Sequence, residues 1–185
     1  DIYRALLNAS RIIPTTTCFH WNYMDGDWYP EFCLGGWNTG GNYREGRGEG
    51  SKFHSVLEWI FNHTLEENWL TIPDYVNRVA SGSKVSEKEV TPVDVAGKLE
   101  GFSHKTLEIV CKIREKTAKI DGELECTLMD LEALAYLGYY YAEKTRGATE
   151  IMFFLRTGEK AHQAKSIEHL SKALEWWDKL LEVTS

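Results

Sequence analysis

Apolar residues in the C-terminal part of the chain recur at steps of three or four, the spacing that places them on one face of a helix. The clearest series is Ile167, Leu170, Leu174, Trp177 and Leu181. A strand does not fit this period, because the buried side chains of a strand alternate. We therefore expect the last segment to be an amphipathic helix that packs through this stripe.

The same period predicts further helices between residues 51 and 157, each preceded by residues that cap a helix or favour its first turn. The expected starts are Ser51, Pro73, Thr91 with Pro92, and Asp121 with Gly122. Small residues in the helix after Asp121 would let a neighbouring helix approach closely, namely Ala135, Gly138 and Ala142. That helix is expected to end at Thr157 and Gly158.

Long helices joined by short turns favour an all-α fold, an antiparallel helical bundle. A helix-pair repeat is the rival architecture, but one copy is visible and a solenoid needs about three. The domain organisation expected is a short N-terminal helix with an aromatic- and Gly-rich loop over residues 1–50, and the bundle over residues 51–185. Because the chain opens on residues that already favour a helix, we expect it to be a fragment of a larger protein.

Charge and hydropathy exclude several classes of function. The formal net charge is -7, which argues against nucleic acid as a main partner because phosphate binding needs clustered Lys and Arg. No apolar run approaches the ~20 residues that span a bilayer. Hydrophobic residues make up 43% of the chain, which argues against disorder.

The four cysteines lack the C-x-x-C spacing of zinc or redox motifs. Cys111 and Cys126 fall in helical patterns, where a buried free thiol is expected. Cys18 and Cys33 flank a loop, so a bridge between them is an open alternative in an oxidising compartment.

The segment over residues 14–50 is long, irregular and rich in Gly and aromatic residues, and long loops in compact domains are often functional. Aromatic faces mixed with carboxylates and amides suit sugar recognition. The competing interpretation is that these rings only pack the segment against its helices. The candidate substrate-binding residues are His20, Trp21, Asp27, Trp28, Glu31 and Trp37.

No residue is assigned a catalytic role, because nothing in the sequence fixes the separation of the loop carboxylates Asp25, Asp27 and Glu31. The six histidines form no metal-ligand motif. His54 and His63 are expected on the first bundle helix, while His162 and His169 are seven residues apart and can share a face. No metal and no cofactor are expected.

Several stretches resemble the helical C-terminal region of α-glucuronidase-like glycoside hydrolases of gut bacteria. They are residues 9–14, the His20 to Glu31 segment, residues 140–148 and residues 167–177. The resemblance implies a secreted protein, periplasmic or extracellular, in which an upstream catalytic barrel carries the reaction. It also implies that the loop helps to line a glycan cleft of that barrel.

The leading hypothesis is therefore an accessory helical domain of a carbohydrate-active protein, not an enzyme by itself, with an oligosaccharide or polysaccharide and an upstream catalytic domain as partners. The alternative from a different class is a protein-interaction or structural bundle with no ligand site. That alternative predicts buried rings and an exposed apolar patch. A free-standing enzyme that uses the loop carboxylates is a third hypothesis.

Overall fold

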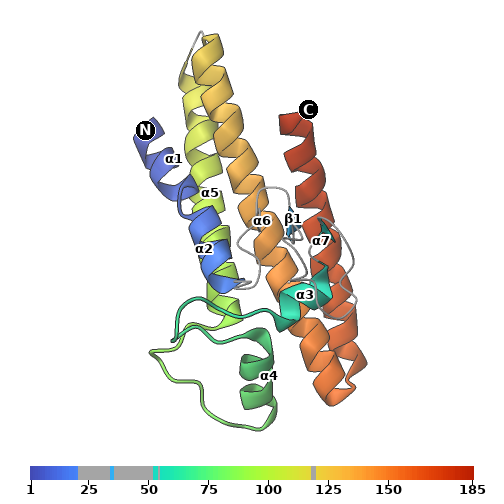
Figure 1. Ribbon diagram of the computed structural model, residues 1–185. Helices are drawn as coiled ribbons and strands as arrows, with labels where there is room; N and C mark the ends of the chain where they lie inside the picture. The colour runs from blue at the N-terminus through green and yellow to red at the C-terminus, as the bar shows by residue number, and fades with distance from the viewer. Residues whose placement is uncertain (21–33, 36–51, 54, 118–119) are drawn as a thin grey trace, which may run out of the picture.

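The computed structural model describes residues 1–20, 34–35, 52–53, 55–117 and 120–185. These residues are mostly helical and pack as a bundle, which confirms the all-α prediction (Figure 1). The helices are α1 Ile2–Ala9, α2 Ile12–Phe19, α3 Val56–Phe61, α4 Ile72–Ala80, α5 Pro92–Lys116, α6 Gly122–Thr157 and α7 Lys160–Thr184. Two short strands, β1 Leu34–Gly35 and β2 Lys52–Phe53, pair antiparallel.

The predicted ends of the long helices are confirmed because the capping chemistry is present. Thr91 and Asp94 form a reciprocal capping box at the start of α5, with Pro92 in the first turn. Asp121 accepts a hydrogen bond from the Leu124 backbone N–H at the start of α6. Gly158 ends α6 in the left-handed conformation, at φ +75°, which favours glycine.

The first bundle helix begins later than predicted. Ser55 caps α3 and forms a capping box with Glu58, whereas Phe53 belongs to β2. Sequence reasoning placed the cap at Ser51, because a run of apolar residues beginning at Phe53 has helical spacing. His63 accordingly follows the end of α3 instead of lying on it. His54 lies outside the described residues.

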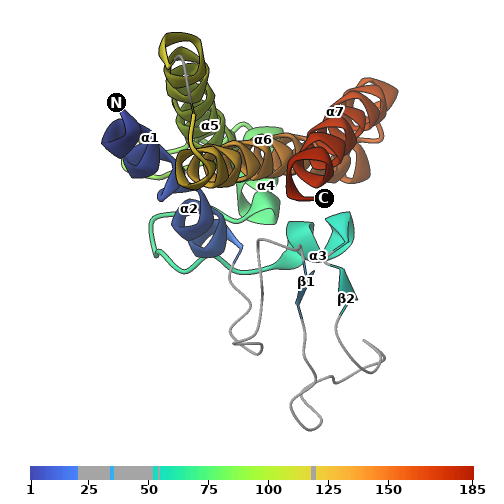
Figure 2. The ribbon, with the colours of Figure 1, turned by 90° about the horizontal axis from the view of Figure 1, so that it is seen from above.

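Helix α6 lies between the other two long helices (Figure 2). It contacts α5 on one side and α7 on the other, and the shorter helices α2, α3 and α4 also pack against it. Helix α1 packs mainly against α5. Figure 1 shows α1 and α7 at opposite edges of the bundle.

Small residues on α6 allow these close approaches, as predicted. A Cβ on Gly138 would clash with the Ser103 hydroxyl of α5 and crowd Ile12 of α2. Further along α6, a Cβ on Gly147 would lie 2.8 Å from Leu170 of α7. These two glycines therefore mark where α6 meets its neighbours most closely.

Other expectations need correction. The side chains of Cys111 and Cys126 are exposed, because each lies on the outward side of its helix. Cys18 is a free, half-buried thiol, and Cys33, the other residue of the possible bridge, lies outside the described residues. Helix α2 extends to Phe19, well into the segment expected to be irregular from residue 14.

Candidate functional site

Of the predicted substrate-binding residues, His20 is the one that the structure describes. Its side chain is 1% exposed and stacks on the Trp59 ring of α3, with the ring centroids 4.0 Å apart. The His20 Nε2 lies 2.9 Å from the amide nitrogen of Asn62. Trp21, Asp27, Trp28, Glu31 and Trp37 lie outside the described residues, so their role stays a prediction.

Trp59 is the centre of a stack of buried rings. It contacts His20 on one side and Tyr141 of α6 on the other, with the Trp59 and Tyr141 centroids 4.9 Å apart. Its indole N–H donates to the Thr145 hydroxyl at 3.1 Å. The stack therefore fixes α3 and the end of α2 against the middle of α6.

Lys144 of α6 is buried against the same rings. Only 3% of the residue is exposed, and its Nζ lies 5.1 Å from the Trp59 centroid, 5.3 Å from Tyr140 and 5.8 Å from Tyr141. Ring faces attract a cation electrostatically, and the attraction is stronger away from water. Lysine is rarely buried without a partner, and here the faces of three rings surround its ammonium group.

An open groove of about 260 Å³ runs beside this lysine, between α6 and α7. Tyr140 and Lys144 line it from α6, Leu170 and Leu174 from α7, and Val56 from α3. The groove has a predominantly apolar lining, which includes the exposed Leu174 of α7. It therefore joins the buried aromatic stack to the surface of the last helix.

The apolar stripe of α7 is only partly buried, contrary to the prediction. Ile167 is 62% exposed, Leu174 65% and Leu181 50%. The side of α7 that packs against the bundle is instead centred on Ser166, Ala173 and Leu180. Leu170 and Trp177 lie at the margin between the two rows and are half-buried. We call Ile167, Leu174 and Leu181 the α7 row.

Carboxylates border the α7 row. Glu168, Glu175 and Glu182 each follow a member of the row directly in the sequence, and all three are exposed. The Lys172 ammonium bonds Glu168 at 2.7 Å and lowers the pKa of that carboxyl. The row is thus an aliphatic strip bordered by carboxylates, of which Glu168 is paired with Lys172.

Two histidines of α7, whose spacing allows them to share a face, pair with glutamates of α6. His169 Nδ1 lies 2.6 Å from Glu143 and His162 Nδ1 lies 2.5 Å from Glu150. Glu143 also accepts a hydrogen bond from Arg146 at 2.7 Å, and Arg146 bonds Glu100 of α5. These polar contacts tie the three long helices together.

The described part of the chain offers little support for metal binding, thiol chemistry or a membrane span. No group of three or more His, Cys, Asp and Glu side chains is arranged for a metal ion there. Burial raises the pKa of the Cys18 thiol, and the nearby Glu66 adds to the effect, so the reactive thiolate is disfavoured. No helix among the described residues is long and apolar enough to cross a membrane.

Sequence reasoning missed Trp59, Tyr141 and Lys144, and it did not foresee the exposure of the α7 row. A signal for the first group existed in the run Tyr139, Tyr140 and Tyr141, since consecutive aromatic residues on a helix must meet more than one neighbour. The run Glu143, Lys144 and Thr145 is also buried, which means that α6 is enclosed on several sides. Both runs indicate a helix that is packed on several sides, not one with a whole face in solvent.

Comparison of the chain with protein-family models, with curated proteins and with solved structures finds no match. The resemblance to α-glucuronidase-like proteins therefore stays a prediction. The site rests on the geometry described above, in which the α7 row is a regularly spaced set of exposed apolar side chains on one helix.

Proposed function

We propose that the chain is a helical protein-interaction module that docks a helix of its partner on the α7 row. The observation that carries the proposal is the exposure of Ile167, Leu174 and Leu181, each at least half accessible to solvent. Single exposed apolar residues are ordinary on protein surfaces, whereas a contiguous apolar strip marks an interaction site.

The spacing of the row suits a helical partner. Seven residues separate successive members, so they lie on one side of α7 and the row extends for about 21 Å. Peptides that bind as helices place anchors at such intervals in an apolar groove. The groove beside Leu174, lined by Leu170 and Tyr140, offers that geometry.

Burial of these side chains by a partner is favourable. Each aliphatic side chain that moves from water into an interface contributes roughly 1.5–3 kcal/mol when it becomes fully buried. The α7 row is already held rigidly, because His162 and His169 anchor α7 to α6 on its other side. A rigid surface loses less conformational entropy on binding.

The glycan-accessory role and the extracellular location stay predictions from the sequence, as does the expectation that the chain is not an enzyme by itself. The described residues add no observation in favour of a glycan site, since His20 is buried in the aromatic stack. The interaction module is the alternative that the sequence left open, and the exposed α7 row supports it because that alternative expects an exposed apolar patch.

Selection from a display library of helical peptides tests the proposal. We expect enriched peptides to carry apolar residues at steps of three, four and seven, and to bind the wild-type chain. Leu174→Glu should reduce their affinity at least tenfold, whereas Val93→Glu should not, because Val93 is an exposed apolar residue on a different helix, α5. Enriched peptides that bind the Leu174→Glu variant as well as the wild type would contradict the proposal.

A further inference from the structure

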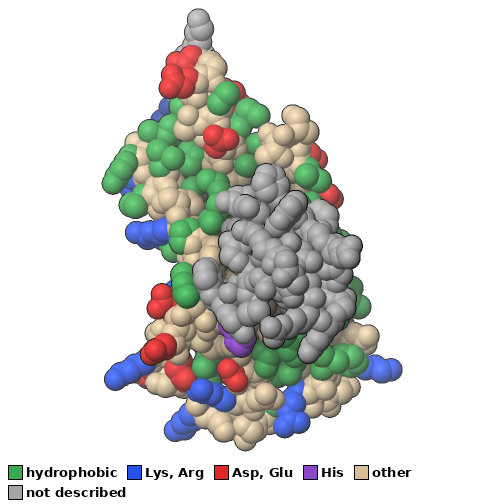
Figure 3. Space-filling model, viewed as in Figure 1, with side chains coloured by type: hydrophobic (Ala, Val, Ile, Leu, Met, Phe, Trp, Pro, Cys, Tyr) green, Lys and Arg blue, Asp and Glu red, His purple; other side chains and the backbone are tan. Residues whose placement is uncertain are grey.

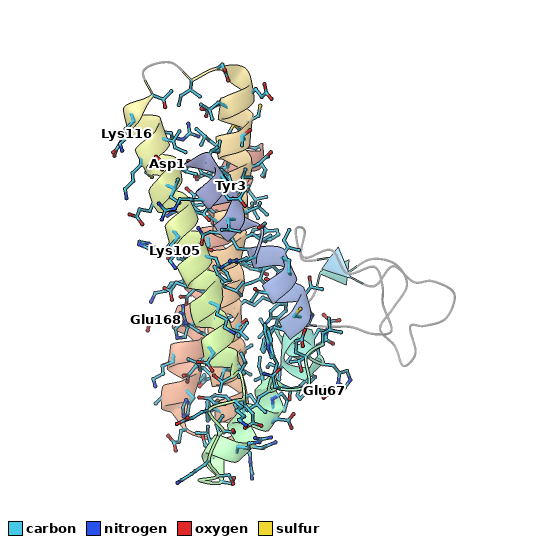
Figure 4. All side chains as sticks on the ribbon, turned by 90° about the vertical axis from the view of Figure 1, so that its left-hand side faces the viewer. Asp1, Tyr3, Glu67, Lys105, Lys116 and Glu168 are labelled. Carbon is cyan, nitrogen blue, oxygen red and sulfur yellow. The ribbon has the colours of Figure 1, made fainter. Side chains whose placement is uncertain are left out.

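The edge of the bundle opposite α7 carries a basic groove. It has a volume of about 460 Å³ and lies between α1 and α5. Arg4 of α1 and Lys105, Lys112 and Lys116 of α5 line it, together with Ile109 and the carboxylates of Asp1 and Glu108, so that cations outnumber carboxylates. Lys112 is paired with Glu108 of the same helix. Figure 4 shows Lys116 on α5 near the start of α1 and Lys105 further down the same helix. This gathering of cations is unexpected in a chain of net charge -7.

Apolar side chains are exposed elsewhere on α1, although they are not among the residues that line the groove. Tyr3, Leu6 and Leu7 of α1 point outward, since Ala5 and Ala9 take the buried side of that short helix. Figure 3 shows hydrophobic side chains gathered over α1 and the adjoining parts of α5 and α6. The α1–α5 face therefore combines exposed apolar groups with a row of cations.

The two edges are complementary in charge and in spacing. Glu168, Glu175 and Glu182 are seven residues apart along α7, and Lys105 and Lys112 are seven residues apart along α5. A helix rises 1.5 Å per residue, so both sets repeat about every 10 Å. Aliphatic side chains accompany the charges on both faces.

We propose that a second copy of this chain is the partner, with α7 of one copy docked in the α1–α5 groove of the next. The inference rests on the proposed function, because it identifies what the α7 row binds. Leu174 and its neighbours in the row would meet Ile109 and the exposed side chains of α1. The glutamates that border the row would face the lysines of α5.

Pairing of α7 with α7 is the competing self-contact, and charge disfavours it. A two-fold axis that brings two α7 helices together antiparallel places the same flank of each helix side by side. The glutamate at 175 would then face its own copy, and Glu168 would face Glu182. Like charges at such distances oppose association, whereas the lysines of the α1–α5 groove favour it.

The proposed contact joins different surfaces, so it leaves one edge of each copy free. Figures 1 and 2 place α1 and α7 at opposite edges of the bundle. Heterologous contacts of this kind close into rings or continue as filaments, according to the rotation between neighbours. The expected species therefore extend beyond a dimer as concentration rises.

Sedimentation velocity of the full chain at increasing concentration tests the inference. We expect the weight-average mass to rise above that of a monomer and to fall again in high salt, which screens the charge pairs. Leu174→Glu alters the α7 row, and the double variant Arg4→Glu with Lys105→Glu alters the groove. Each variant alone should stay monomeric, and Val93→Glu should associate like the wild type.

A mixture of the two variants gives the sharper result. The groove of the Leu174→Glu variant is intact, and so is the α7 row of the double variant, so the mixture should form a one-to-one dimer and nothing larger. A wild-type chain that is monomeric at every concentration overturns the inference. So does continued association of the groove variant by itself, which would indicate pairing of α7 with α7.

These outcomes are separable from failure of the proposed function. If the wild-type chain is monomeric but selected helical peptides bind it through Leu174, the docking role stands and the second copy is not the partner. If neither the peptides nor a second copy bind, both proposals fail. Circular dichroism and thermal melting of each variant establish that a lost interaction is not a lost fold.

Discussion

Individual polar residues hold this fold at the points where apolar packing alone would not define it. Lys144 is enclosed by three aromatic rings, and the Trp59 indole N–H has a hydroxyl partner on Thr145. Buried polar groups that are satisfied cost little and restrict the alternatives open to the core. The same principle applies at helix ends, where a single side chain determines whether a helix starts.

The capping box of α5 gives a pH-dependent contribution to stability. The Thr91 hydroxyl and backbone N–H lower the pKa of Asp94 below its ordinary value of 3.8. A carboxyl with a lowered folded pKa stabilises the fold above its unfolded pKa and loses that effect as the pH falls through the folded value. We expect Thr91→Ala to lower the free energy of unfolding by about 1 kcal/mol near neutral pH.

Urea unfolding of the wild type and Thr91→Ala at several pH values measures this contribution. The difference between the two proteins should begin to shrink as the pH falls below about 4, where Asp94 of the unfolded chain becomes protonated, and should shrink further as the pH falls through the lower pKa of Asp94 in the folded protein. Asp94→Asn, which cannot ionise, supplies the control background: the effect of Thr91→Ala measured in Asp94→Asn should not change with pH. A difference that stays constant down to pH 2 would falsify the role of the Asp94 charge.

At the scale of the helix, the sequence predicts where a helix starts and ends, but not which of its sides is buried. Thr91, Asp121 and Gly158 act through neighbours only a few residues away, so their effects can be read from local sequence. The buried side of α7 depends on what α6 presents, and α6 presents Gly147 and the glutamates that bind His162 and His169. The spacing of apolar residues therefore identified α7 as a helix, but it predicted the wrong row of side chains to be buried.

Two glycines of the long helices should respond to alanine with opposite signs. A Cβ at Gly101 of α5 meets nothing within 4 Å, so Gly101→Ala should stabilise the chain by up to about 1 kcal/mol through helix propensity. A Cβ at Gly138 of α6 would clash with Ser103 and crowd Ile12. Gly138→Ala should therefore destabilise by about 1–2 kcal/mol, even after the gain in propensity.

Chemical unfolding of both alanine variants and the wild type measures the two changes in the free energy of unfolding and their signs. Serine at position 103 is the near neighbour, so Ser103→Ala combined with Gly138→Ala should recover part of the loss. Equal stability of the two single variants would contradict the close approach of α5 and α6 at Gly138.

For the whole molecule, α6 is the helix around which the others assemble. The helical bundle could be predicted from the sequence, because long amphipathic helices with short connections have few ways to bury their apolar faces. The candidate surface could not be located in the same way, since it is defined by what remains exposed after assembly. Of the predicted site residues, His20 lies inside the stack around Trp59, and that stack joins α2, α3 and α6, which are distant in sequence.

Removal of α7 tests how much of the bundle depends on it. A chain that ends at Glu159 loses the stacking of Tyr139 on Trp176, which lie 4.3 Å apart, and the contact of Tyr140 with Trp177. We expect a broad thermal transition and binding of a hydrophobic dye, the signs of lost side-chain packing. A sharp transition at the wild-type temperature would mean that α1 to α6 fold independently of α7.

The connection between α6 and α7 is short, and its length sets the phase of the last helix. Each residue turns a helix by about 100°, so one residue more or fewer in the connection changes which row faces α6. Deletion of Glu159 would move Ile167, Leu174 and Leu181 into the places of Ser166, Ala173 and Leu180, whereas an insertion would bring in Lys165, Lys172 and Lys179. The length of the connection thus determines that the α7 row is exposed. Deletion of one residue there would bury the row against α6 without changing any residue of the row.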